Sequence, residues 1–314
     1  MSAGDGVLGR GFGHGKVILV GEHAVVHGHA ALAAAISTGI SAEARAGAAG
    51  GAHLRVPAWN LEAAAGDGTP VGRALEAIVR RVAAPGLDFE ADARIPSRAG
   101  LGSSAALATA IARAAAAAIG RADATDLVDA AVTEAEEVFH GNPSGIDAAA
   151  AKSGLTGRFS RAAGWHLVPV LQKITICVGL SGRPRDTAAQ VAAVGRLRER
   201  LPAAGEVLAL LGRLADDAAA ALAKGDVDGL GRIMDAAHGL LAALRLSSPE
   251  LETLVHGARA AGAVGAKLTG AGGGGAVIAL APGHARDVLA RWRAAGFDGF
   301  LADIAAAPAP GAGA

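Results

Sequence analysis

Residues 95–106 form a glycine-rich stretch whose residue types are suited to binding phosphate. The stretch runs from an apolar strand, through a loop with glycines at 100 and 102, into an alanine-rich helix. Glycines let the backbone approach an anion, and the free amides and dipole of a helix start favour negative charge. Ser103 and Ser104 add hydroxyl oxygens that can contact phosphate or Mg²⁺. No Gly-Lys-Ser/Thr closes the loop, so it is no Walker A sequence, and a plain helix cap explains the spacing equally well.

A second glycine cluster, residues 272–275, ends a segment that begins at Lys267 and precedes an apolar strand. Four consecutive glycines lose a large conformational entropy on folding, so a fold keeps them chiefly where another group approaches the backbone closely. A flexible hairpin in a glycine-rich protein is the alternative. We favour a binding role over the hairpin.

Three titratable residues flank the apolar run 17–20, which predicts a buried strand. Lys16 stands directly before this run, and Glu22 and His23 follow it after one glycine. Taken alone, a solvated lysine at a strand start and a hydrogen-bonded loop histidine are the ordinary interpretations. These residues gain weight only together with the other motifs.

Two carboxylates lie in and after the predicted helix 125–139. Glu136 is at the edge of the helix's apolar arc, where a carboxylate is partly buried and needs a partner. A metal ion is one such partner, and an ordinary salt bridge is the other. Asp147 follows a glycine- and proline-bearing turn, a position at which an aspartate usually caps a helix.

Together these motifs resemble the mevalonate kinase family, a branch of the GHMP kinases. Five segments match the family in the family's own order, which chance does not explain. The segments are 15–28, 95–106, 136–147, 185–187 and 267–275. The segment 136–147 resembles mevalonate kinases more than galactokinases or homoserine kinases.

The resemblance implies an α+β fold with two domains. Residues 1–170 would form an N-terminal domain similar to ribosomal protein S5, with the ATP-binding loop, and residues 171–314 a ferredoxin-like C-terminal domain. The implied activity is transfer of the γ-phosphoryl group of ATP to mevalonate, with Mg²⁺ as a second cofactor.

The resemblance also implies roles in the reaction. Asp147 would accept or orient the proton of the attacking hydroxyl, and Lys16 would stabilise the negative charge that develops there. Ser104 and Glu136 would hold Mg²⁺, and the sequence does not separate Ser103 from Ser104 in this role.

Two groups of binding residues follow from the same motifs. Contacts to the nucleotide phosphates would come from Gly100, Leu101, Gly102, Ser103, Ser104 and Ala105. Contacts to mevalonate would come from Glu22, His23, Arg185, Thr187, Gly272, Gly273 and Gly274. A basic group among them is required for the carboxylate of this substrate.

The sequence departs from the family's usual pattern at several positions. Gly13 and His14 stand where the family usually has alanine and proline, and Ala148 and Ala276 where it usually has asparagine and cysteine. One alternative is a GHMP kinase for phosphomevalonate, a sugar or homoserine, although a phosphorylated acceptor would call for an additional basic pocket. Another is a catalytically inactive binding module, but Lys16 and Asp147, whose loss would favour it, are both present.

The composition fits a folded protein that acts on small molecules. The chain has 314 residues, of which 52% are hydrophobic and 18% charged, and its formal net charge is zero. This balance favours neither nucleic acid nor an anionic membrane as a partner. Because the N-terminus has no signal-peptide pattern, we expect a cytoplasmic protein. The sequence leaves open whether it is a monomer or a homodimer.

Hydrophobic periodicity predicts the elements that must position these residues. Helix caps are expected at Ser103 or Ser104 and at Thr125. Strands are predicted at 17–20, 88–95, 173–180, 276–280 and 299–304, with 30–36 a strand or a helix. Helices are predicted at 69–82, 103–119, 125–139, 186–223, 226–244, 249–261 and 284–295. This mixture, with helices grouped late in the chain, indicates an α+β fold.

Overall fold

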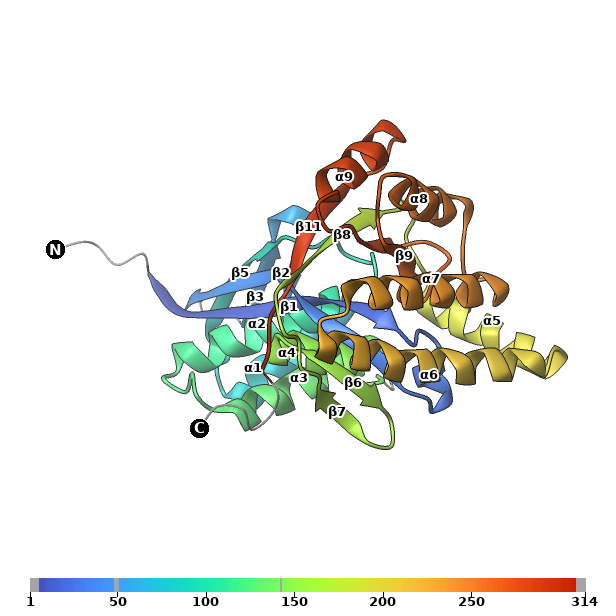
Figure 1. Ribbon diagram of the computed structural model, residues 1–314. Helices are drawn as coiled ribbons and strands as arrows, with labels where there is room; N and C mark the ends of the chain where they lie inside the picture. Colours follow the sequence, from blue (N-terminus) through green and yellow to red (C-terminus); the bar gives the residue numbers. More distant parts are fainter. Residues whose placement is uncertain (1–5, 48–50, 142, 309–314) are drawn as a thin grey trace. The chain divides into compact units, whose positions relative to one another are not determined.

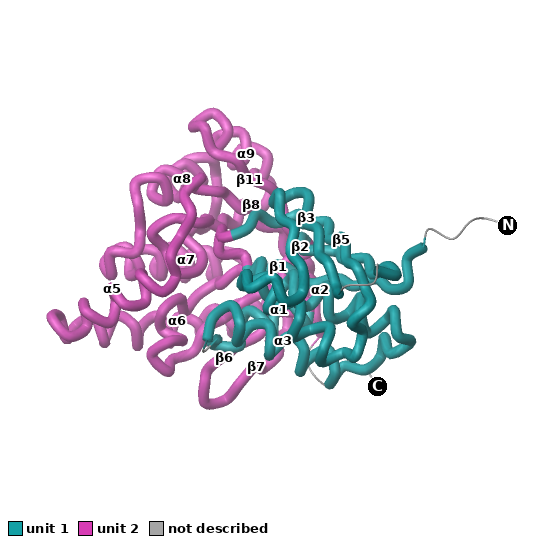
Figure 2. Tube along the Cα trace, turned by 180° about the vertical axis from the view of Figure 1, so that it is seen from behind, with its two compact units in different colours: residues 1–15, 38–97, 102–153 teal, residues 16–37, 98–101, 154–314 magenta. Residues whose placement is uncertain are grey.

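The computed structural model describes residues 6–47, 51–141 and 143–308, and the chain forms two compact units. Unit 1 consists of residues 1–15, 38–97 and 102–153, and unit 2 of residues 16–37, 98–101 and 154–314 (Figure 2). The long strands β1 (Val7–Val20) and β2 (Ala31–Ala46) contribute residues to both units. The predicted domain boundary between residues 170 and 171 stays a prediction.

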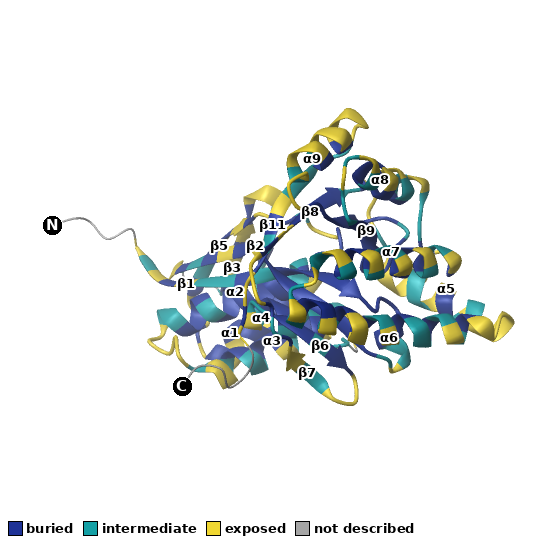
Figure 3. Cartoon of the chain, in the orientation of Figure 1, coloured by how far each residue is buried: buried dark blue, intermediate teal, exposed yellow. Residues whose placement is uncertain are grey.

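Within its described residues, unit 1 combines strands with four α-helices. In this unit the strand order is β4-β3-β5-β2, and β1 pairs with β2. The added strands are β3 (His53–Val56), β4 (Leu61–Ala64) and β5 (Leu87–Ala93). The helices are α1 (Pro70–Val82), α2 (Ser103–Ala118), α3 (Thr125–His140) and α4 (Ile146–Ser153) (Figure 1). Helix α1 packs against α2 and α3 and buries Leu75 and Ile78 (Figure 3).

A row of glycines on β1 explains how α2 is held in unit 1. A Cβ atom added at Gly9, Gly11 or Gly13 would collide with a backbone carbonyl of α2, and the three carbonyls belong to residues 114, 110 and 106. Two strand residues span about 6.6 Å and four helical residues about 6 Å, so the two repeats stay in step. The glycines therefore allow the helix backbone to lie directly on the strand.

Unit 2 contains an antiparallel sheet with the order β11-β8-β10-β9. Helices α7 and α8 pack on β9, α8 also packs on β10, and α9 packs on β8. The strands of this sheet are β8 (Ile174–Leu180), β9 (Gly265–Thr269), β10 (Ala276–Leu280) and β11 (Gly299–Ile304). Strands β6 (Thr156–Ser160) and β7 (Gly164–Leu167) extend the first half of β2. The helices are α5 (Thr187–Arg200), α6 (Ala203–Lys224), α7 (Val227–Ala243), α8 (Pro249–Ala260) and α9 (Ala285–Ala294).

The predicted α+β class is confirmed, while several local predictions are wrong. Helix α2 is capped by Gly102 in a left-handed conformation, φ 72°, and not by Ser103 or Ser104. Thr125 is the first residue of α3 and does not cap it. The predicted helix 186–223 is two helices, because Pro202 disfavours helical geometry in the residue before it. None of the described helices is both long enough and apolar enough to span a membrane.

Candidate active site

Lys16, a predicted site residue, contacts the first part of the glycine loop, and both lie in unit 2. Strand β1 delivers Lys16, whose side chain is almost fully buried. Its backbone N–H donates to the carbonyl of Leu101 at 2.9 Å, and its Nζ donates to the carbonyl of Gly100 at 3.3 Å. The lysine is therefore a buried group tied to the loop, and the solvated alternative is wrong.

Glu22 forms a buried ion pair that the sequence did not predict. Its Oε1 accepts a hydrogen bond from Nζ of Lys267 on β9, and both side chains are fully buried. Burial raises the pKa of Glu22, an effect that the charges of Lys267 and Lys16 oppose. Burial lowers the pKa of Lys267, and Glu22 opposes that shift. Three charges thus share one low-dielectric region, with two cations for one carboxylate.

A buried threonine fastens β1 to β9 beside this pair. Oγ1 of Thr269 accepts from the N–H of Ile18 at 2.9 Å and donates to the carbonyl of Ile18 at 3.2 Å. Nζ of Lys267 donates to the same carbonyl at 3.3 Å. Since Ile18 is two residues after Lys16, these contacts fix the strand that presents the lysine.

His23 is held as a neutral imidazole in unit 2. Its backbone has a φ of 59°, which is unfavourable for a residue with a Cβ and must be enforced by its surroundings. Burial lowers the pKa of His23, while the carbonyl of Ala271, 2.9 Å from Nε2, opposes the shift. If Nε2 donates to that carbonyl, Nδ1 is an acceptor. Among the described residues, neither this Nδ1 nor Oε2 of Glu22 has a hydrogen-bond partner, although both are buried.

The second glycine cluster makes room for the protein's own side chains and backbone. A Cβ atom at Gly100 would lie 2.8 Å from Cζ of Arg185, and one at Gly270 would collide with the same guanidinium group. At Gly273 the obstacle is Gln190, and at Gly272 a backbone carbonyl. The close approach predicted from these glycines is therefore real, and the approaching groups belong to the chain.

Arg185 and Thr187 differ in their surroundings at the start of α5. Arg185 is half-buried beside the glycines of both motifs. Thr187 is the first residue of α5 and is exposed. The side chain of Asp186 caps the helix, accepting from the N–H of Ala189 at 3.0 Å. The structure thus places Arg185, but not Thr187, at the buried loops.

The start of α2 in unit 1 suits a phosphate group. Gly102 offers no side-chain cap, and the first helical hydrogen bond of the turn is donated by Ala106 to Gly102. The amides of Ser103, Ser104 and Ala105 belong to the first turn, where an α-helix supplies no acceptor. An anion bound at the start of this 16-residue helix would supply acceptors for these amides.

Ser104 and Glu136 are linked through a histidine that sequence reasoning did not single out. His140 follows Glu136 by one helical turn in α3, and its Nε2 lies 3.1 Å from Oγ of Ser104 and 4.0 Å from Oε2 of Glu136. Glu136 is almost fully buried. The i, i+4 spacing of the two residues was the available signal.

These residues fit a magnesium ion that takes most of its ligands from elsewhere. No group of three or more histidine, cysteine, aspartate or glutamate side chains among the described residues could hold a metal. A hydroxyl and one carboxylate are nevertheless what Mg²⁺ typically takes from a protein when nucleotide phosphates and water complete its shell.

Asp147 lies in the first turn of α4 in unit 1 and is half-buried. The guanidinium of Arg113 anchors this helix, donating to the carbonyl of Lys152 and to the carbonyl of Phe12, each at 2.7 Å. Nζ of Lys152 adds an ion pair with Asp129 at 2.8 Å. The short helix is therefore tied at its end to β1, α2 and α3.

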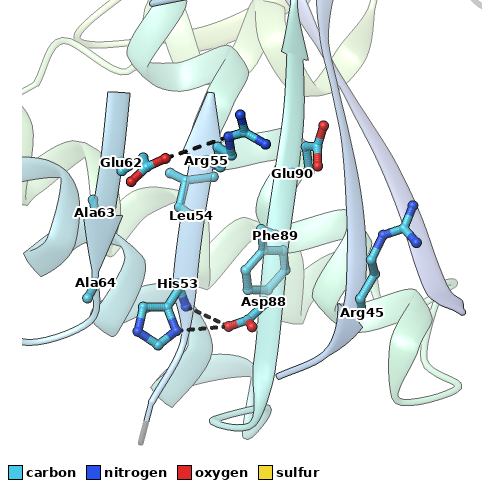
Figure 4. A pocket seen from close by; sticks show the side chains of 10 residues that line it. All are labelled: Arg45, His53, Leu54, Arg55, Glu62, Ala63, Ala64, Asp88, Phe89 and Glu90. Carbon is cyan, nitrogen blue, oxygen red and sulfur yellow. Dashed lines mark hydrogen bonds and ion pairs between the residues drawn. The ribbon is translucent and has the colours of Figure 1, made fainter. Parts of the chain in front are cut away.

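None of the predicted site residues lines an open hollow of about 510 Å³ in unit 1 (Figure 4). The hollow is lined by residues of β3, β4 and β5, and two of its basic side chains are paired with carboxylates. Nδ1 of His53 is 3.1 Å from Asp88, and Nε of Arg55 is 3.6 Å from Glu62. Because its three basic side chains are matched by three carboxylates, the hollow offers no excess positive charge to a phosphorylated substrate.

Two family models place the chain among the GHMP kinases, a class of small-molecule kinases. The N-terminal domain model of the GHMP kinases matches residues 70–154, and their C-terminal model matches residues 218–298. The chain belongs to the mevalonate kinase family. It is 39% identical over 289 residues to a mevalonate kinase of Aeropyrum pernix, covering 85% of this chain and 86% of that one. It is 34% identical to one of Pyrococcus horikoshii, covering 90% and 91%.

Solved structures agree with this assignment. The L. major mevalonate kinase in complex with R-mevalonate has a TM-score of 0.83 and 28% identity, covering 96% of this chain and 97% of that one. The Methanococcus jannaschii mevalonate kinase also has a TM-score of 0.83, with 94% and 98% covered, and its 22% identity supports the fold alone.

Proposed function

We propose that this protein transfers the γ-phosphoryl group of ATP to mevalonate, giving 5-phosphomevalonate for the mevalonate route to isoprenoids. The observation that supports this most directly is the pair of buried acceptors, Oε2 of Glu22 and Nδ1 of His23. Buried acceptors without donors are unfavourable, so they suit a substrate with hydroxyl groups. Lys16 and Arg185 in the same unit would attract its negative charges.

The two proposed catalytic residues have different roles in the reaction. Asp147 accepts, or orients, the proton of the attacking hydroxyl. Lys16 stabilises the negative charge that develops on the reacting oxygens, and it can do so strongly because it is desolvated. Phosphoryl transfer requires little else from the protein than such positioning and neutralisation.

The nucleotide and its metal ion would be held by unit 1. The first-turn amides of α2 bind phosphate oxygens, and Ser104 and Glu136 hold Mg²⁺, with His140 orienting the hydroxyl of Ser104. Bound Mg²⁺ neutralises the charge of the β- and γ-phosphates. Since ATP and mevalonate are both water-soluble, we expect the enzyme to act in the cytoplasm, and a homodimer stays a prediction.

An ATP-coupled assay across several acceptors tests the function. Purified protein with Mg-ATP should phosphorylate mevalonate faster than phosphomevalonate, galactose or homoserine. Asp147→Asn protein, prepared in parallel, serves as the control for contaminating kinases. A clear preference for one of the other three acceptors would contradict the proposed substrate while leaving the kinase class in place.

A further inference from the structure

Lys267 is a buried cation with no role in the phosphoryl transfer proposed above. Its side chain is fully buried on β9, and its Nζ has three oxygen partners. They are the carbonyl of Ile18 at 3.3 Å, the carbonyl of Leu268 at 2.6 Å and Oε1 of Glu22. An ammonium group has three donors and no acceptor. All of its hydrogen-bonding capacity is therefore used, and its direction is fixed.

The contact with Lys267 fixes only one of the two carboxylate oxygens of Glu22. Oε1 accepts from Lys267, whereas Oε2 is buried and has no hydrogen-bond partner within the described part of the chain. A buried carboxylate oxygen without a donor is unfavourable. The arrangement becomes complete when a bound molecule supplies a hydrogen-bond donor to Oε2.

A purely structural role explains this ion pair poorly. Buried pairs can often be replaced by apolar residues of similar volume without loss of stability. Here the positive charge of Lys16 also acts on both Glu22 and Lys267. The surplus of positive charge favours an ionised Glu22, which is what a strong acceptor requires.

We infer that Lys267 is a positioning residue, which holds Glu22 ionised and directs its Oε2 toward the non-reacting hydroxyl of the acceptor substrate. The inference rests on the proposed function, in which that substrate is mevalonate, or 3,5-dihydroxy-3-methylpentanoate. The 5-hydroxyl is phosphorylated, and the carboxylate of mevalonate would be repelled by Glu22. The 3-hydroxyl is the donor that remains for Oε2.

The test compares mevalonate with 5-hydroxy-3-methylpentanoate, which lacks only the 3-hydroxyl. The wild-type kcat/KM for this analogue should be about 10- to 100-fold lower, because a hydrogen bond to a charged acceptor is lost. Equal values for the two compounds would overturn the inference and leave the proposed function intact. Failure of the wild-type protein to phosphorylate mevalonate would instead overturn the proposed function.

Two variants, Lys267→Met and Lys267→Met/Glu22→Gln, together separate a positioning role of Lys267 from a role in folding. The single variant should raise KM for mevalonate much more than KM for ATP, and reduce the discrimination against the analogue to about threefold. Because it leaves Glu22 as an uncompensated buried charge, it can also destabilise the fold. Lys267→Met/Glu22→Gln removes both charges at nearly constant shape, so it should fold as stably as wild type and still lose the discrimination.

Lys173→Met is the matched control, since it breaks a lysine–carboxylate pair at the surface of the same unit. Nζ of Lys173 lies 3.1 Å from Oδ2 of Asp303, and the lysine side chain is exposed. This variant should keep the wild-type KM values and the wild-type discrimination. Wild-type discrimination in either of the two Lys267 variants would refute the positioning role.

Discussion

The contact between Thr269 and Ile18 supports the end of β1 that carries Lys16, and Thr269→Val tests the importance of this contact. Valine has nearly the shape of threonine, so the substitution removes the hydroxyl without opening a cavity. It deletes one hydrogen bond of 2.9 Å from the N–H of Ile18 and one of 3.2 Å to the carbonyl of Ile18. The carbonyl keeps Nζ of Lys267 as a donor, but the buried N–H loses its acceptor.

The expected loss follows from that single unpaired N–H group. A buried donor without a partner is unfavourable by about 1–3 kcal/mol, and the added methyl group offsets little of this. With an unfolding entropy of about 2.1 cal/mol/K per residue, each kcal/mol lowers Tm by about 1.5 °C in a protein of 314 residues. We therefore expect Tm to fall by roughly 1.5–5 °C, with lower turnover because Ile18 is two residues after Lys16.

Thr156→Val is the matched control in the same unit. Thr156 lies on β6, is as fully buried as Thr269, and its Oγ1 has no hydrogen-bond partner among the described residues. Replacing a buried, unsatisfied hydroxyl by a methyl group should leave stability unchanged or raise it by up to about 2 kcal/mol. Thermal unfolding and urea titration should thus show a loss of stability for Thr269→Val and no loss for Thr156→Val. Equal stability changes in the two variants would refute the importance assigned to the Ile18 contact.

Three further predictions concern the reacting groups and the buried histidines. Asp147→Asn should lower single-turnover rates about 10²–10⁴-fold with ATP binding unchanged. Adding Lys16→Met to this variant should make little further difference to the rate. Additive losses would show that the two residues act independently. Glu136→Gln should raise the Mg²⁺ concentration needed for turnover at unchanged Tm, and an unaltered Mg²⁺ titration would exclude it as a ligand. Burial lowers the pKa of His23 and His238 in the folded protein. The free energy of unfolding that is present above about pH 6.5 should therefore decline as pH falls below this value, by up to about 1.4 kcal/mol per histidine per pH unit. Urea titrations at about pH 7.5 and 5.5 should show a smaller decline for His238→Gln.

Periodicity predicted the regular elements well where one face is apolar and failed where polar residues are buried. Strand β9 contains Lys267 and Thr269, which interrupt its apolar pattern, and so it was not predicted. Both side chains are buried because they bind Ile18 of β1. A local pattern cannot show that a polar residue will find partners about 250 positions away.

The motifs predicted candidate site residues but not the partners of these residues. Lys16, Glu22 and His23 are buried, and the ion pair from Glu22 to Lys267 joins two motifs that sequence reasoning treated separately. His140 was not singled out, because the predicted helix 125–139 ended one residue before it, whereas α3 includes it. Its place between Ser104 and Glu136 depends on the packing of α2 beside α3.

Part of the glycine and alanine content of the chain sets the position of α2. The glycines at alternate positions of β1 face the backbone of α2 at every fourth residue. Any side chain in that row would push the helix away, and the first-turn amides of α2 would move with it. A pattern of alternate glycines in one segment and alanines at intervals of four in another therefore predicts a helix seated on a strand. The same strand continues to Lys16, which belongs to unit 2.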